Sequence, residues 1–332
     1  MTDIDDILAK LNPKTAALFR KASEVENRIL PTPSLGINLA VGGVGHGRIS
    51  TLWGNRSSGK SLFCLGLARK AQEQGMSVSW VDAEKNFDPV WARRNGVDPK
   101  KMILTRATGM ADIADASVDL VKTGVDLHIV DSMSVLLPQS FFVDGEMKSF
   151  SDTGQIGTFS KNYGSMVNMV NNVNENTAVV FISQVRNKIN TYGAAKSLMG
   201  GEAADFINSL IIKFWSNPNP KEDINGDVRN GDLVLKKPVG RPVTWTIDKA
   251  RGPGMHMTNE YDMYFAGEHV GIDLVGEILD LGVDHGVVRK GGAWYYFGDD
   301  KYQGRPAAVN ALRGSSELQD RLYYEIMQTV AA

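Results

Sequence analysis

The sequence predicts an α/β protein in which helices flank a mostly parallel β-sheet. Three observations indicate this class. Continuous apolar runs occur at residues 47–53, 77–82, 127–131 and 178–183. Helical patterns separate these runs, and unbroken apolar strands joined by helices are typical of parallel sheets covered on both faces. The first run also leads directly into a glycine-rich turn and then a helical pattern, which is the strand–turn–helix unit of such folds.

Composition limits the kinds of protein this chain can be. Its 332 residues suffice for one large α/β domain with a smaller attachment. The net charge of −2 does not indicate nucleic-acid binding by the whole chain, so any basic DNA path must be local. The single cysteine, Cys64, excludes an internal disulfide framework and suits a reducing cytoplasm. The acidic N-terminus carries no signal segment, and no apolar run is long enough to span a membrane.

The first segment, residues 1–33, is expected to be an N-terminal helical unit. Within residues 13–29, Leu18, Ala22, Val25 and Ile29 are spaced to share one helical face. Prolines at positions 31 and 33 then end the pattern. Such a helix could pack on its own core or on a neighbouring subunit, and periodicity does not choose between the two.

Residues 54–61 read Gly-Asn-Arg-Ser-Ser-Gly-Lys-Ser and fit the phosphate-binding pattern G-x-x-x-x-G-K-[ST]. Backbone N–H groups of such a loop form an anion-binding nest at the start of a helix, here expected over residues 61–71 and ended by Gly75. Lys60 is expected to reach the β- and γ-phosphates, and the Ser61 hydroxyl to bind Mg²⁺. The nucleotide-binding residues predicted here are Gly54, Asn55, Arg56, Ser57, Ser58, Gly59, Lys60, Ser61 and Leu62.

Two acidic positions follow apolar strands. Asp131 ends the run at 127–131, where a Walker-B carboxylate holds Mg²⁺ or its water shell. Glu84 follows the run at 77–82, where a carboxylate can deprotonate the attacking water. Both lie at carboxyl ends of strands, the edge where doubly wound sheets place their sites. A helix cap or a surface charge is the alternative for each.

The remaining elements suggest a core and a smaller unit. Residues 243–248 alternate in polarity and predict a further strand. From residue 267 onwards the pattern predicts a helix over 273–281, an aromatic β element over 291–298 and a closing helix over 318–330. We therefore expect a core over residues 34–266 and a small α+β domain over 267–332.

At residues 81–93 the pattern becomes specific, because Val-Asp-Ala-Glu-Lys-Asn-Phe-Asp-Pro-Val-Trp-Ala-Arg together with the loop at 54–61 resembles the bacterial RecA recombinase family. Residues 125–138, 181–189 and 271–304 are similar to that family in the same order. The resemblance runs from residue 34 to the C-terminus. The chain departs from the common bacterial sequence at many positions, which suggests a divergent member, with a phage genome as a candidate source.

The resemblance implies a P-loop NTPase core of RecA type and an ATP-dependent recombinase with Mg²⁺ as cofactor. Members of the family form a helical filament on single-stranded DNA and exchange strands with homologous duplex DNA, in recombination and DNA repair. The implied partners are therefore both forms of DNA and further copies of the chain, with single-strand-binding and loader proteins as candidates. The implied location is the cytoplasm of a bacterial cell.

The resemblance also implies roles for individual residues. It makes Glu84 the catalytic base, and it places Asp88 and Trp91 against adenine, although Trp91 could instead be a core aromatic. Gln184 ends a strand, and its amide could bond the γ-phosphate and so couple ATP to the loop that follows. Lys249 matches one of two lysines that reach the phosphates from the neighbouring subunit. The second of these positions is Ile247, so Arg251 becomes the candidate for the missing charge.

Two loops are the predicted DNA contacts. The segment from 186 to 201 is polar, glycine-rich and basic, and the residues expected to bind DNA there are Arg186, Asn187, Lys188, Tyr192, Lys196, Gly200 and Gly201. The segment from 141 to 153 supplies Phe142 and Lys148, where an apolar side chain could wedge between bases. The alternatives are a solvated surface for the first loop and core packing for the second. Basic residues between 289 and 305 could also gather duplex DNA.

The same sequence features also bear on three other functions. A ring-shaped DNA helicase shares the core ATPase, but it needs a hexamer-forming N-terminal domain for which residues 1–33 are too short. A mediator that binds nucleotide without exchanging strands would not need Lys60, Glu84, Asp131 and Gln184 together. A nucleotide kinase would need an acceptor-binding lid, and none is evident.

Overall fold

The computed structural model describes residues 4–16, 19, 21–107, 109–137, 141–143, 146–147, 158–187, 196–197, 205–217, 219, 221, 223–230, 233–252, 257–297 and 300–331. In this part of the chain, ten strands form one central sheet in the order β16-β15-β14-β12-β3-β9-β6-β4-β5, with β13 paired to β14. The strands are β3 (Arg48–Gly54), β4 (Val78–Asp82), β5 (Met102–Thr105), β6 (Leu127–Asp131), β9 (Ala178–Gln184), β12 (Leu210–Trp215), β13 (Ile224–Asn230), β14 (Leu233–Ala250), β15 (Thr258–Tyr264) and β16 (Gly271–Ile272).

The sheet has a parallel and an antiparallel part. Strands β12, β3, β9, β6, β4 and β5 are mutually parallel, whereas β14 runs antiparallel to β12 and pairs with β15 and β13. The strands expected at 47–53, 77–82, 127–131 and 178–183 are β3, β4, β6 and β9, which confirms the predicted fold class. The strand expected at 243–248 is the end of β14, which is far longer than its alternating stretch.

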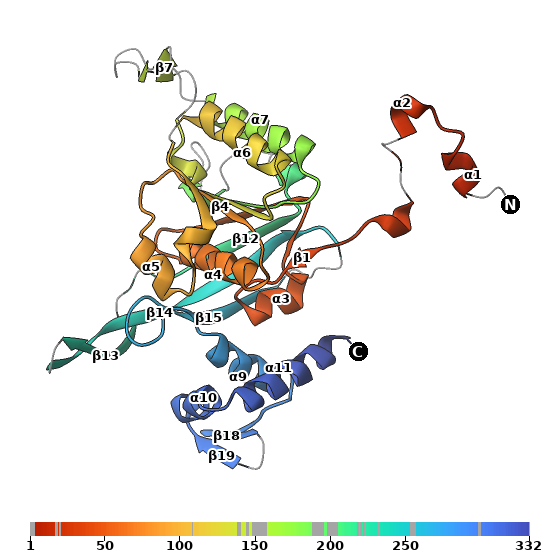
Figure 1. The fold of residues 1–332 in the computed structure, drawn as a ribbon. Helices are drawn as coiled ribbons and strands as arrows, with labels where there is room; N and C mark the ends of the chain where they lie inside the picture. Colours follow the sequence, from red (N-terminus) through yellow and green to blue (C-terminus); the bar gives the residue numbers. More distant parts are fainter. Residues whose placement is uncertain are drawn as a thin grey trace.

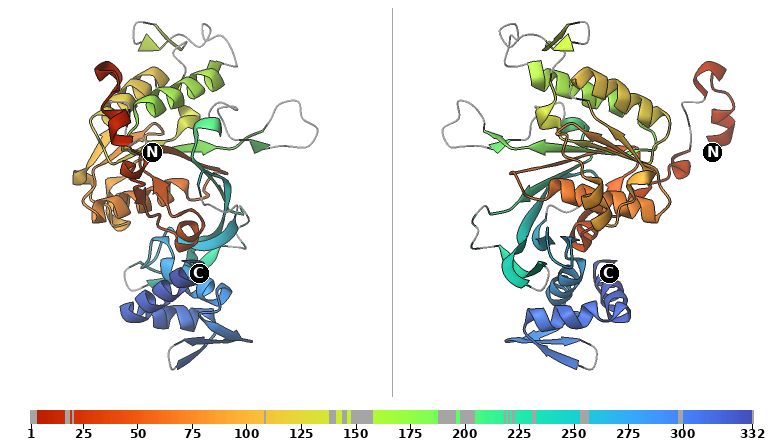
Figure 2. Two further views of the ribbon diagram at one scale, coloured as in Figure 1. Left: turned by 90° about the vertical axis from the view of Figure 1, so that its right-hand side faces the viewer. Right: turned by 60° about the vertical axis from the view of Figure 1, so that its left-hand side comes forward.

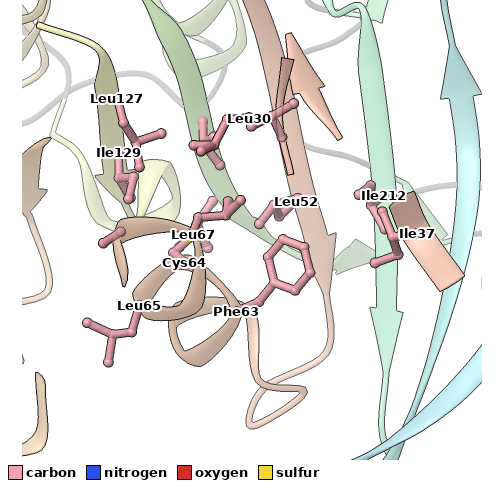
Figure 3. Close-up of a cluster of buried hydrophobic side chains, with 14 of the residues drawn as sticks. Leu30, Ile37, Leu52, Phe63, Cys64, Leu65, Leu67, Leu127, Ile129 and Ile212 are labelled. Atoms are coloured by element: carbon pink, nitrogen blue, oxygen red, sulfur yellow. The ribbon is translucent and has the colours of Figure 1, made fainter. Parts of the chain in front are cut away.

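Helices cover both faces of the parallel part (Figure 1). On one face lies α4 (Lys60–Glu73), whose Phe63 and Leu67 pack with Leu52 of β3 in a buried cluster (Figure 3). On the other face, α6 (Met110–Lys122) and α7 (Thr158–Val173) enclose a second cluster around Tyr163 and Phe181. Shorter helices are α3 (Leu35–Val41) and α5 (Pro89–Arg94). Cys64 is fully buried in the first cluster, as expected of a structural thiol.

The C-terminal residues build a unit with its own apolar cluster. It contains α9 (Leu274–Asp284), α10 (Arg305–Arg313) and α11 (Ser316–Ala331), with a three-stranded antiparallel sheet of β17 (Arg289–Gly291), β18 (Trp294–Phe297) and β19 (Asp300–Gln303). Figure 2 shows this unit at one end of the molecule, beyond the central sheet. Leu35 of α3 belongs to the same cluster, so the packing is continuous with the core.

A buried carboxylate joins the two parts. Glu277 of α9 accepts hydrogen bonds from the Ser34 hydroxyl at 2.6 Å and from the N–H groups of Leu35 at 2.7 Å and Gly36 at 3.1 Å. These donors lie at the N-terminus of α3, where a negative charge is favoured. Burial nevertheless raises the pKa of Glu277 to about 7, because the three hydrogen bonds offset the loss of solvation only in part.

The N-terminal segment differs from the expectation of one helix over residues 13–29. Its described residues form α1 (Ile4–Leu8), α2 (Pro13–Ala16), a 3₁₀ turn at Ala22–Glu24 and the start of β1 (Ile29–Leu30), which pairs with β2 (Val44–Gly45). No residue of α1 or α2 is buried, and both stand clear of the rest of the molecule in Figure 1. Helices this short gain too little from their own hydrogen bonds to propagate without packing, which explains why the amphipathic pattern does not yield a continuous helix.

Candidate nucleotide-binding site and DNA-facing loops

A cavity of about 1000 Å³ lies over the loop that follows β3. Its lining comes from segments far apart in the sequence: the loop itself, the turn after β4, α5, the ends of β6 and β9, the turn after β6, and the β14–β15 wall. The residues that line it are Arg56, Ser57, Ser58, Gly59, Lys60, Ser61, Leu62, Ala83, Glu84, Lys85, Asn86, Trp91, Asp131, Val135, Ile182, Gln184, Arg241, Met263 and Phe265. Residues predicted separately as a phosphate loop, a Walker-B acid and a base therefore share one space.

The loop backbone needs glycine at both ends of the motif. Gly54 has φ of 154°, and a Cβ there would lie 1.8 Å from the Phe214 carbonyl oxygen of the neighbouring strand. Gly59 has φ of 82°, and a Cβ there would lie 2.1 Å from the Met263 sulfur. The Asn55 amide fixes the loop to β12 by donating to the Ser216 carbonyl at 2.7 Å. The G-x-x-x-x-G spacing is thus required by close neighbours as well as by phosphate chemistry.

Lys60 and Asp131 face each other in a poorly solvated environment. The Lys60 Nζ donates to the Asn55 carbonyl at 2.8 Å and to the Gly54 carbonyl at 3.2 Å. Burial lowers the pKa of Lys60 to about 8, although the carboxylates of Asp131 and Glu84 oppose this shift. Burial likewise raises the pKa of Asp131 to about 6, against a hydrogen bond from the Ser61 hydroxyl and the charge of Lys60. A bound polyphosphate would favour the charged form of Lys60.

Ser61 and Asp131 suit a magnesium ion. A hydroxyl and a carboxylate that already hydrogen-bond to each other present two oxygens side by side, and Mg²⁺ prefers few protein oxygens supplemented by phosphate and water. Within the described residues, no group of three or more His, Cys, Asp or Glu side chains could hold a metal by itself. The donor set therefore fits an ion that arrives with a nucleotide.

Glu84 is held by donors from three elements. Its Oε1 accepts from the Ser132 hydroxyl at 2.6 Å and from the Gln184 amide at 3.1 Å, and its Oε2 lies 3.5 Å from the Asn86 amide. The N–H of Gln184 in turn donates to the Ser134 hydroxyl at 2.7 Å. Glu84 therefore caps no helix in these contacts and is held by side chains that end or follow β4, β6 and β9.

The predicted adenine contacts lie at the side of the cavity. Trp91 of α5 is half-buried and lines both the main cavity and a smaller one of about 140 Å³ beside it. The Arg94 guanidinium lies 5.4 Å from the Trp91 ring centre. Asp88 lines only the smaller cavity, and its carboxylate caps α5 by accepting from the Val90 N–H at 2.7 Å.

Sequence reasoning missed several residues of this site. Ser132 and Ser134, which position Glu84 and Gln184, follow Asp131 directly, so a hydroxyl after a Walker-B acid was a usable signal. Arg241, Met263 and Phe265 come from strands that pair only in the folded chain. No local pattern around those three residues indicates a nucleotide cavity.

The predicted DNA contacts are described only in part. Arg186 and Asn187 form β10, which pairs with β11 (Lys196–Ser197) in a hairpin that continues from the end of β9 (Figure 2). Phe142 lies in β7 (Phe142–Val143), paired with β8 (Glu146–Met147). The other predicted contacts, Lys188, Tyr192, Gly200, Gly201 and Lys148, lie outside the described residues.

Lys249 and Arg251 lie apart from the cavity, since neither is among the described residues that line it. Both instead donate to backbone carbonyls just after the predicted DNA loop at residues 186–201. Lys249 contacts the carbonyls of Asp205 and Phe206, and Arg251 contacts that of Phe206. Burial, followed by the charge of Arg251, lowers the pKa of Lys249.

The C-terminal sheet carries cations over aromatic rings. Arg289 lies 4.1 Å from the Tyr296 ring centre, Lys290 lies 5.2 Å from that of Tyr295, and Lys301 lies 5.1 Å from that of Trp294. Arg305, which the sequence grouped with these residues, instead forms ion pairs with Asp262 at 2.9 Å and Asp280 at 2.7 Å. Its role is therefore to tie α10 to α9 and β15.

Comparisons with known proteins agree with this architecture. A model of the RecA N-terminal domain matches residues 8–243, and one of the RecA C-terminal domain matches residues 276–331. Protein RecA of Chlorobium limicola is 32% identical over 301 residues, covering 89% of this chain and 80% of the relative. Protein RecA of Nitratidesulfovibrio vulgaris (strain Hildenborough) is 30% identical over 308 residues (90% and 81%), and that of Methylobacterium sp. (strain 4-46) is 31% identical over 317 residues (93% and 81%).

Proposed function

Because this chain belongs to the RecA family, we propose that it is a DNA-dependent ATPase that forms a helical filament on single-stranded DNA. The filament would search for homology and exchange strands with duplex DNA, in recombination and repair. We also propose a polymerisation segment over residues 1–33, an ATPase core with DNA-binding loops over 34–266 and a small C-terminal domain over 267–332. In the described residues no helix has the length and apolarity needed to cross a bilayer. For the location of the protein, we propose the cytoplasm.

One observation carries this proposal: the Gln184 amide bonds Glu84 inside the cavity at 3.1 Å, while the backbone two residues further on enters the β10–β11 hairpin. A γ-phosphate beside Glu84 would compete for the same amide. Gln184 would then shift between two partners, and the attached hairpin would shift with it. Such an exchange of contacts is a physical means by which nucleotide state can control a DNA-binding segment.

The chemistry follows from the same contacts. Lys60 and the loop N–H groups would hold the β- and γ-phosphates, and Glu84, oriented by Ser132, would accept the proton of the attacking water. Mg²⁺, held by Ser61 and Asp131, would neutralise the charge that develops on the phosphate oxygens. Asp88 and Trp91 would lie at the base end, where an aromatic face can stack on adenine.

DNA would be contacted at more than one place. We propose that single-stranded DNA binds the segments that contain Arg186, Asn187, Lys188, Tyr192, Lys196, Gly200 and Gly201, with Phe142 and Lys148 contributing from the other loop. Arg289, Lys290 and Lys301 on the C-terminal sheet would attract the duplex. Contacts of this kind carry little base information, so pairing between strands would supply the specificity.

The deciding experiment is a strand-invasion assay with the wild type, Lys60→Ala and Glu84→Gln, in which ATP hydrolysis is followed in parallel. We expect Lys60→Ala to lose nucleotide binding and joint-molecule formation. Glu84→Gln should retain ATP-dependent filaments while hydrolysis falls by roughly 10²- to 10⁴-fold, the range that a general base supplies.

Two outcomes would contradict the proposal. Robust hydrolysis by Glu84→Gln would remove that residue from the role of base. Closed rings in electron micrographs with ATP and single-stranded DNA would favour a helicase, and wild-type filaments without joint molecules would favour a mediator.

A further inference from the structure

Arg241 lines the nucleotide cavity from a wall that no motif predicts. It lies in β14 directly opposite Met263 of β15, and Met263 packs against Gly59 of the phosphate loop. Phe265 follows two residues later and lines the same cavity. This pairing places a guanidinium beside the phosphate loop, on the wall formed by β14 and β15.

The guanidinium is held in place without using all its donors. Its Nη2 forms an ion pair with Asp223 at 3.2 Å, and its central carbon lies 5.5 Å from the Phe265 ring centre. The side chain of Asp223 is only 9% exposed, which limits its motion. Among the described residues, the buried Nε of Arg241 has no hydrogen-bond partner. The side chain as a whole is 22% exposed and lines the cavity, so the rest of the guanidinium can meet a ligand there.

The order of the strands indicates which end of a nucleotide Arg241 would meet. Gln184, Asp131 and Glu84 end or follow β9, β6 and β4, which all lie on one side of β3. Arg241 lies on β14, on the other side of β3 and beyond β12. The γ-phosphate is therefore expected beside the first group, and the β14–β15 wall, which contacts the phosphate loop through Met263, lies away from it.

We propose that Arg241, oriented by Asp223 and Phe265, binds the part of the nucleotide that ATP and ADP share, donating from the accessible part of its guanidinium to the α-phosphate or the ribose. This inference rests on the proposed function, because it presupposes that the cavity holds ATP. The proposal adds Arg241 to the predicted nucleotide-binding residues, as a cation that contacts ATP and ADP alike. Arg241 is therefore a determinant of nucleotide affinity and takes no part in discriminating the triphosphate from the diphosphate.

The test is isothermal titration calorimetry of the full chain with Mg²⁺ and either ADP or the non-hydrolysable analogue AMP-PNP. Arg241→Met keeps the apolar stem and removes the donors. We expect it to weaken both nucleotides by the same factor of about ten, as for loss of one hydrogen bond to a charged group. Asp223→Asn, which keeps the guanidinium but loosens it, should weaken both by a smaller common factor, and Arg241→Lys should restore part of the loss.

Lys236→Met is the matched control, because Lys236 is an exposed cation of the same strand that does not line the cavity. Its affinities for both nucleotides should equal those of the wild type.

Unchanged binding by Arg241→Met, or a loss confined to AMP-PNP, would overturn the proposal. Failure of the proposed function gives a different result, since Lys60→Ala would then bind AMP-PNP as tightly as the wild type. If Arg241→Met also melts at a lower temperature, Asp223→Asn decides the question. A loss of affinity in Asp223→Asn that is the same for ADP and AMP-PNP supports the proposal. Unchanged affinities for both nucleotides in that variant reject it.

Discussion

At the scale of single residues, the main feature is how one carboxylate is positioned. Ser132 at 2.6 Å and Gln184 at 3.1 Å both donate to the same oxygen of Glu84. Oε1 thus has two close donors, whereas among the described residues Oε2 has only the more distant Asn86 amide at 3.5 Å. A water molecule bound for attack would meet Oε2 first, which makes this the oxygen that we expect to act as base.

Lys249 and Arg251 give a prediction at the same scale. In the single chain they donate to carbonyls at positions 205 and 206, and in a filament they would be released to reach the neighbour's phosphates. We expect Arg251→Ala and Lys249→Ala each to lower DNA-stimulated ATP turnover by about a hundredfold, the order that one donor to a transition state supplies. Steady-state hydrolysis with and without single-stranded DNA measures this.

Lys236→Ala serves as the comparison, since it removes an exposed cation of the same strand. Normal DNA-stimulated turnover by Arg251→Ala, alongside a defect in Lys249→Ala, would show that Arg251 does not replace the cation missing at Ile247.

At the scale of elements, His128 links β6 to both β4 and α6. Its Nδ1 lies 2.8 Å from the Ser79 hydroxyl and its Nε2 lies 2.9 Å from that of Ser117. The ring is fully buried, and this burial lowers the pKa of His128 to about 4. Between pH 6.5 and 4 the unfolded chain therefore binds a proton that the folded chain does not.

The sign of the resulting pH dependence follows directly. As the pH falls from 6.5 to 4, His128 should lower the free energy of unfolding, and above pH 6.5 it should have no such effect. We expect urea denaturation to show a weaker loss of stability over this window in His128→Gln than in the wild type. His269→Gln, which changes an exposed histidine, should follow the wild type, and parallel curves for all three proteins would contradict the assignment.

Elements were predictable where the signal is local. The loop at 54–61, the strands that end near Asp82 and Asp131, and the helix after the loop depend on neighbours within a few residues, so the sequence predicts them correctly. The length of β14 was not predictable, because its first half pairs with β13 in an exposed hairpin and lacks a buried face to set a clear period. The same limit hid Arg241 and Phe265, which reach the cavity only because β14 pairs with β12, the neighbour of β3, in the folded sheet.

At the scale of the whole molecule, two separate surfaces expose apolar side chains. The N-terminal arm, residues 4–29, exposes Ile7 and Phe19, which are 50% and 53% accessible. Strand β5 is an edge of the sheet and exposes Ile103 and Leu104, at 51% and 40%. An unpaired strand edge with apolar side chains is a site where another chain can bind. The projecting arm of a second copy is suited to bind there. Assembly of copies would then cover both surfaces.

This arrangement predicts that assembly can be blocked from either surface. We expect the double variant Ile7→Asp/Phe19→Asp to form no filaments with ATP and single-stranded DNA. The double variant Ile103→Lys/Leu104→Lys should fail to form them in the same way. Neither should change nucleotide binding by the isolated chain, because none of these residues lines the cavity. Electron microscopy and sedimentation measure the first effect, and calorimetry measures the second.

Val234→Asp is the matched control, since Val234 is an exposed apolar residue of the β14 hairpin at 52% accessibility. Normal filaments from both double variants would place the assembly interface elsewhere on the molecule.

Strand β14 has a mechanical consequence for such a polymer. Arg241, at the chain's own cavity, and Lys249, which we expect to serve the next cavity, lie eight positions apart on one extended backbone; at about 3.3 Å per residue this is roughly 26 Å. The strand pairs with β15 over Gly240–Thr246 and with β12 over Thr244–Ala250. It can therefore hardly stretch, and it would act as a rigid spacer between consecutive ATP molecules. The pitch of the polymer could then change by rotation of subunits about this spacer, while the step from one ATP to the next stayed nearly constant.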